Sequence, residues 1–198
     1  MKNKITLIIA ILLTFSCLAA LPSAFTKRGN PELYRQIRLQ ARHNLKNLDS
    51  DARKAYQRLL KDHNDILMHY LIAYEIDGIL QIADPHDVYS NYQQIVQLLE
   101  TKEFDLEPEF FLSYVAKQTV ADERIQAYRK AFMDDGLAEV LASATDELDL
   151  YRKVCDWGLE RLVFQPTSGR DLSPLDITTS SYLGRCEEMQ ILFIAAAR

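Results

Sequence analysis

Glycine and proline are scarce in this sequence, with six of each among 198 residues, and only three cysteines are present. The scarcity of both residues argues against low-complexity linkers, and the cysteines form no paired zinc-binding pattern. A basic excess is also missing, because the formal net charge is −5, which excludes the electrostatic footprint of a nucleic-acid-binding protein. Glycine-rich phosphate loops and calcium-loop spacings are absent too, so the sequence predicts no cofactor and no metal.

Hydrophobic residues make up 48% of the chain, enough for a buried core, and its length fits either one domain or one domain and part of a second. Residues 1–24 are typical of a targeting segment, since Lys2 and Lys4 precede an apolar run and Cys17 lies near a small-residue cleavage site. Three interpretations stay open: a cleaved signal peptide, a lipoprotein lipidated at Cys17, and an uncleaved anchor. Each predicts an exported protein (periplasmic, cell-surface or secreted), and the last two add a membrane tether.

Residues 27–164 are predicted to form an all-helical domain, because apolar residues recur there at helical spacing. The clearest helix start is Asn30 followed by Pro31, which combines a capping residue with proline at the first helical position. One apolar face of this helix is expected at Tyr34, Ile37, Ala41, Leu45 and Leu48.

Further helices are expected over residues 66–80, around 121–133 and over 146–164. The first of these is apolar on nearly all sides and is therefore expected to be buried. No strand is expected before residue 165, because no convincing alternating pattern occurs there. The last helix is expected to bury Leu148, Tyr151, Cys155, Leu159 and Leu162.

Residues 165–184 differ from the rest, since proline, glycine, serine and threonine are concentrated there and predict a long irregular loop. This loop leads to Cys186, which precedes Glu187 and Glu188 in the first turn of an apolar helix. A helix N-terminus presents unpaired N–H groups and a partial positive charge, which favour the thiolate form of a cysteine. Cys186 is therefore a candidate nucleophile, and the alternative is a small buried hydrophobic residue.

The segment around Cys186 resembles the nucleophile segment of the transglutaminase-like superfamily. The resemblance is carried by SYLGRCEE at residues 181–188 and by LFIAAAR at residues 192–198. The stretch from FQPT to DLSP, residues 164–174, is similar to the approach loop of bacterial secreted members, and residues 111–132 are more faintly similar to their helical N-terminal region.

The resemblance implies a papain-like α+β core that begins at residue 165 and a Cys-His-Asp triad with Cys186 as nucleophile. It implies acyl transfer or amide hydrolysis on a peptide or protein substrate, with the oxyanion held by the backbone N–H of Cys186 and by a second donor, for which Tyr182 is the candidate. The sequence departs from the family because no histidine or aspartate follows Cys186. The four histidines precede it and are each expected on a solvated or mixed helix face: His43, His63, His69 and His86.

We therefore expect a mostly α chain that carries the first loop and the nucleophile helix of the core, over residues 165–198, without the C-terminal sheet. Such a chain resembles the N-terminal part of a longer protein and is expected to have little triad activity by itself. Cys155 is expected to pack in the helical core, with a disulfide to Cys186 as the alternative that an exported compartment permits.

Two other interpretations of the whole chain stay open. One is a non-catalytic helical binding or scaffold module with a degenerate or missing thiol domain. The other is a papain-like peptidase of another lineage. The sequence leaves the substrate, the ligand of the helical domain and the oligomeric state undetermined.

Overall fold

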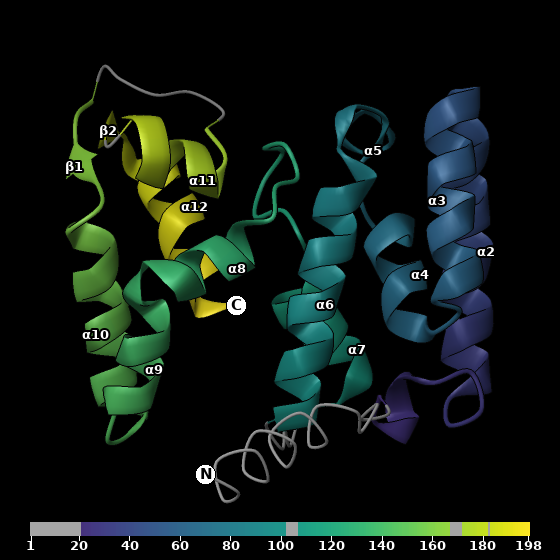
Figure 1. Cartoon of the computed structure of the whole chain (residues 1–198), viewed down its shortest axis with the longest axis horizontal. Coiled ribbons are helices and arrows are strands. Elements are labelled where there is room, and N and C mark those ends of the chain that lie inside the picture. The colour runs from purple at the N-terminus through teal and green to yellow at the C-terminus, as the bar shows by residue number, and fades with distance from the viewer. Residues whose placement is uncertain (1–20, 102–106, 167–171, 182) are drawn as a thin grey trace, which may run out of the picture.

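The computed structural model of the chain describes residues 21–101, 107–166, 172–181 and 183–198. Tyr182 and nearly all of the expected targeting segment lie outside the described residues. The chain is mostly helical, as expected, and its described residues contain one two-stranded sheet. It forms two halves side by side, with helices α2 to α7 in one and α8 to α12 in the other (Figure 1). None of the described helices is long and apolar enough to cross a membrane.

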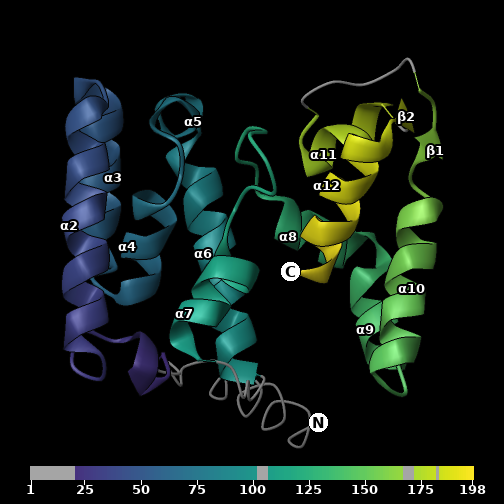
Figure 2. The ribbon, with the colours of Figure 1, turned by 180° about the vertical axis from the view of Figure 1, so that it is seen from behind.

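The N-terminal half is a helical bundle in which α4 is enclosed by its neighbours (Figures 1 and 2). Its hydrophobic core draws on residues from Phe25 to Ile125. The elements, in order, are the short 3-10 turn η2 (Ser23–Phe25), α2 (Pro31–Asn47), α3 (Ser50–Asp62), α4 (Ile66–Ala73), α5 (Asp77–Ile82), α6 (Pro85–Thr101), α7 (Pro108–Phe111) and the π-helical turn η3 (Leu112–Ala116).

Helix α2 confirms the sequence prediction in detail. The side chain of Asn30 accepts a hydrogen bond from the backbone N–H of Leu33, and Pro31 occupies the first turn. The expected apolar face is buried in full, and it packs mainly against α4. Its members are Tyr34, Ile37, Ala41, Leu45 and Leu48.

The single buried helix expected over residues 66–80 is wrong, because the structure breaks it into α4 and α5. Every residue of α4 is buried, as predicted, but the helix ends at Ala73. The buried amide of Asn44 donates to the carbonyl oxygens of Ile72 and Ala73, at 3.0 and 2.8 Å, and so satisfies groups that a continuing helix would have paired. The break depends on a tertiary partner that local periodicity does not reveal.

The C-terminal half has its own core, which draws on residues from Tyr128 to Ala196 and so extends across residue 164, where the helical domain was expected to end. Its elements are α8 (Tyr128–Phe132), the π-helical turn η4 (Met133–Leu137), α9 (Ala138–Ser143), α10 (Glu147–Leu159), β1 (Val163–Phe164), α11 (Pro174–Asp176), the π-helical turn η5 (Ile177–Ser181), β2 (Leu183–Gly184) and α12 (Cys186–Ala197).

The helix expected around residues 121–133 begins only at Tyr128. Before it, the buried carboxylate of Glu123 accepts hydrogen bonds from the backbone N–H groups of Val120 and Ala121, at 2.6 and 2.8 Å. These bonds hold the segment in an irregular conformation that competes with a helix.

The expectation for α10 is wrong in its end and in its buried face. The helix ends at Leu159, and residues 163–164, which were expected to be helical, form strand β1. The helix buries Val154, Trp157 and Gly158 instead of the expected stripe. Of that stripe, Leu148, Tyr151 and Leu159 are exposed and Cys155 is half-buried, while Leu162, beyond the helix, is buried as expected.

Polar contacts join the two halves. The guanidinium of Arg198, after the last residue of α12, donates to the carbonyl oxygen of Thr119 at 2.6 Å. The amide of Asn91 on α6 donates to the carbonyl oxygen of Gln126 at 2.9 Å. Thr119 and Gln126 lie between η3 of the N-terminal half and α8 of the C-terminal half, so each bond ties one half to the segment that connects them.

Candidate functional site

Cys186 is the first residue of α12, and its thiol is free and exposed. The helix start is positioned by a short parallel ladder in which Val163 pairs with Leu183 and Phe164 with Gly184. The backbone N–H of Gln165 also donates to the carbonyl oxygen of Gly184, at 2.8 Å. The sequence did not predict this ladder, because a strand of two residues is too short to show an alternating polar and apolar pattern. The paired residues are also twenty positions apart along the chain.

The carboxylate of Glu188 caps the first turn of α12. The carboxylate of Glu188 accepts a hydrogen bond from the backbone N–H of Arg185 at 2.9 Å, and the Arg185 guanidinium lies 3.5 Å from the same carboxylate. Burial acts to raise the pKa of Glu188, but hydrogen bonds from the backbone N–H groups of Arg185 and Glu188 itself outweigh it, so the net pKa is lowered. Glu188 is therefore a buried carboxylate that fixes the turn carrying Cys186.

Gly184 lets the strand approach α12 closely. A Cβ atom at this position would lie 2.6 Å from the Cβ of Glu188 and 2.9 Å from a methyl carbon of Leu162. Glycine is required here by lack of space and not by backbone conformation, since Gly136 alone among the described glycines has a positive φ. The close approach brings the strand and the capping carboxylate together at the start of the helix.

The thiol opens onto a shallow depression of about 320 Å³. Its lining combines apolar surface from Phe164 and Pro166 with the polar side chains of Arg185 and Glu187, which pair with each other at 3.3 Å. The N–H groups of Arg185 and Glu188 already bond to the Glu188 carboxylate, so the start of α12 offers the N–H groups of Cys186 and Glu187 as donors beside the sulfur. This arrangement can hold a carbonyl group next to a nucleophile and favour negative charge on its oxygen.

A larger open groove, of about 450 Å³, lies between α9 and α10. It is lined by charged side chains together with Trp157. The guanidinium of Arg161 lies over the ring of Trp157, 4.2 Å from the ring centroid. No cysteine or histidine lines it, so it offers no nucleophile, and we place the candidate chemistry at the smaller depression.

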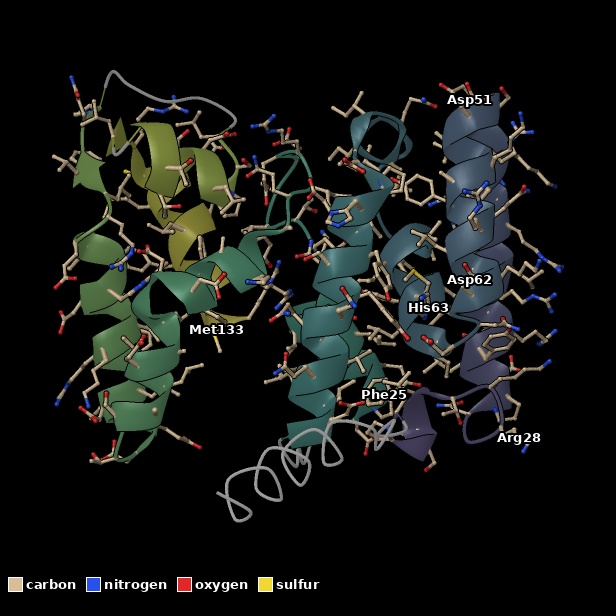
Figure 3. The ribbon with its side chains drawn as sticks, in the orientation of Figure 1. Phe25, Arg28, Asp51, Asp62, His63 and Met133 are labelled. Carbon is tan, nitrogen blue, oxygen red and sulfur yellow. The ribbon has the colours of Figure 1, made fainter. Side chains whose placement is uncertain are left out.

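The histidines all lie in the N-terminal half, whose His63 is labelled in Figure 3. His43 and His86 are exposed, and His63 is half-buried with its ring tilted against two tyrosine rings, at centroid distances of 5.0 and 4.9 Å. His69 is 4% exposed, which contradicts the expected solvated or mixed face. Its ring hydrogen-bonds to Asn64 at 3.1 Å.

The His69 imidazole is kept neutral by its surroundings. Burial lowers its pKa to about 4, and the positive charges of Arg38 and Arg42 add to the effect. The lining of the Cys186 depression contains no histidine among the described residues, so the structure brings the expected nucleophile to the surface without an imidazole beside it.

Both described cysteines are free thiols, so the alternative disulfide between Cys155 and Cys186 is not formed. The candidate second oxyanion donor, Tyr182, lies outside the described residues. Among the residues that the structure describes, no group of three or more histidine, cysteine, aspartate or glutamate side chains is placed to hold a metal ion.

Comparisons of the chain with protein-family models, with curated proteins and with solved structures found no match.

Proposed function

We propose that Cys186 is the nucleophile of an exported thiol protein of the transglutaminase-like kind, which acts by acyl transfer or amide hydrolysis on peptide or protein substrates. The observation that carries the proposal is the exposed, free thiol at the first position of a twelve-residue helix. That position gives the sulfur solvent access and places it beside unpaired backbone donors.

In the proposed reaction the thiolate of Cys186 attacks the acyl carbonyl, and a carbon–sulfur bond forms as the leaving group departs. The backbone N–H of Cys186 stabilises the oxyanion, and Tyr182 stays the predicted second donor. The acyl group then passes to an amine or to water. An amide leaving group needs a proton, and the described lining of the depression contains no imidazole to supply it. We therefore assign only the nucleophile and the first oxyanion donor to the described residues.

A peptide thioester tests this assignment, because its thiolate leaving group departs without protonation. Attack by Cys186 forms a new thioester and expels the small thiol, and intact-protein mass spectrometry followed by peptide mapping measures the rate at each cysteine. We expect Cys186 in the folded chain to react about tenfold faster than the same cysteine in a synthetic peptide of residues 183–190, because only the folded chain presents the helix N-terminus.

Two variants complete the test. Cys186→Ser should abolish the fast adduct, and Cys155→Ala should leave it unchanged. Equal rates for the folded chain and the short peptide, or preferential acylation of Cys155, would contradict the proposal.

The second candidate function is a non-catalytic helical binding module. It is favoured by the placement of all four histidines in the N-terminal half, where His69 is buried and neutral and none lines the Cys186 depression. Failure of the thioester to react selectively at Cys186 in a folded chain would support this candidate over the first.

A further inference from the structure

Helix α10 has a second apolar face that its own chain leaves uncovered. Leu148, Tyr151 and Leu159 are 57%, 67% and 55% exposed, and the half-buried Cys155 lies between them in the sequence. Their spacing of three and four residues places them in one stripe along the helix, opposite the buried Trp157. We refer to Leu148, Tyr151, Cys155 and Leu159 as the outer stripe.

Two more large apolar side chains are exposed beyond the end of the helix. Val163 and Phe164 of β1 are 63% and 50% exposed, and of these Phe164 lines the Cys186 depression. Helix α10 lies at the outer edge of the C-terminal half, and both views show α9 and α12 on its inner side only (Figures 1 and 2). Large apolar side chains gathered on one exposed face mark a surface that binds a partner.

The charges beside the outer stripe identify the kind of partner. Arg152 and Asp156 are both exposed, lie four residues apart along one border of the stripe, and form no ion pair among the described residues. If two copies of α10 pack antiparallel about a twofold axis near residue 154, each Arg152 lies opposite the Asp156 of the other copy. The border is therefore complementary to itself.

We propose that a second copy of this chain covers the outer stripe and forms an antiparallel α10 pair. A twofold interface requires one patch to supply both members of each contact, and the apolar stripe with its opposed charges meets that requirement. A partner of different sequence imposes no such relation between residues 152 and 156. The stripe from Leu148 to Leu159 extends over about 16 Å at the helical rise per residue, long enough for three turns of each helix to pack.

Sedimentation velocity on the full chain tests the dimer directly. We expect a concentration-dependent dimer for the wild type and a monomer for Tyr151→Asp and Leu159→Asp, since each places a charge in the apolar contact. Ile82→Asp is the matched control, because Ile82 is 74% exposed on α5, away from the stripe, and its variant should remain dimeric. Circular dichroism confirms that each variant is folded.

Charge reversal tests the antiparallel register. Arg152→Asp alone and Asp156→Arg alone should each weaken self-association about tenfold, because like charges then face each other across the axis. An equimolar mixture of the two variants should form heterodimers at least as readily as the wild type forms homodimers, since both facing pairs are again of opposite sign. This rescue requires contact between chains, so an ion pair within one helix does not produce it.

Cross-linking tests the position of the axis. In a variant whose other cysteines are serine, a short bismaleimide should join Cys155 to Cys155 of the second copy through two thioether bonds. A wild-type chain that stays monomeric at 100 µM, a dimer unaffected by Tyr151→Asp and Leu159→Asp, or a mixture that fails to form heterodimers would each overturn the proposal.

Discussion

Replacing Gly184 by alanine tests how closely β2 packs against the start of α12, where the thiol lies. The added Cβ would meet the Cβ of Glu188 at 2.6 Å, and that atom is fixed to the helix backbone, so it has no rotamer by which to move away. The methyl carbon of Leu162 at 2.9 Å can turn aside more easily. Overpacking of this kind costs about 1–3 kcal/mol of unfolding free energy.

The chain contains one tryptophan, and Trp157 lies in the same core as Leu162, so its fluorescence reports on unfolding of that core. Urea titrations of wild type and Gly184→Ala should therefore show a lower midpoint with an unchanged slope. Gly78→Ala is the matched control, because no atom lies within 4 Å of a Cβ there, and alanine within α5 should stabilise the chain by up to about 1 kcal/mol. A Gly184→Ala chain as stable as the wild type would refute the packing argument.

Three further substitutions test the buried polar groups by urea unfolding. The pKa of His69 is about 4 in the folded chain and 6.5 in the unfolded chain, so the unfolded state binds the proton first and the free energy of unfolding decreases as the pH is lowered. Between pH 7.5 and 5 the wild type should lose about 2 kcal/mol more than His69→Gln. The control His86→Gln, at an exposed position, should follow the wild type. Asn44→Ala should cost about 1–3 kcal/mol, because it leaves buried carbonyl groups of α4 unpaired. Glu188→Gln should destabilise the chain at pH 7, and because the folded pKa of Glu188 is lowered, the difference should disappear as acid protonates the wild-type carboxylate that caps Arg185.

Local signals account for the parts of the fold that sequence predicted well. Asn30 and Pro31 start α2 through contacts within its first turn. This helix has a single apolar face, so only that face can be buried in the core. The start of α12 at Cys186 was likewise predictable, because the acidic residues and the apolar run that follow it mark a first helical turn.

The errors arise where a distant partner decides between two locally acceptable arrangements. Helix α10 has apolar residues on both faces, and the positions of α9 and α12 select the face with Val154 and Trp157 over the one with Tyr151. Pairing of Phe164 with Gly184, and the break after Ala73, also depend on residues far along the chain. The spacing of apolar residues within one segment does not reveal such long-range contacts.

Helix α12 connects two places that are distant in the fold. Its first residue is Cys186, and Arg198 just beyond its last residue bonds to Thr119 in the segment between η3 and α8. Twelve helical residues give a rod about 18 Å long, which is stiff on that scale. Helix α12 therefore spans the C-terminal half from the exposed thiol at its first residue to the hydrogen bond between Arg198 and Thr119 at its other end, so a single packed helix fixes both features in the same core.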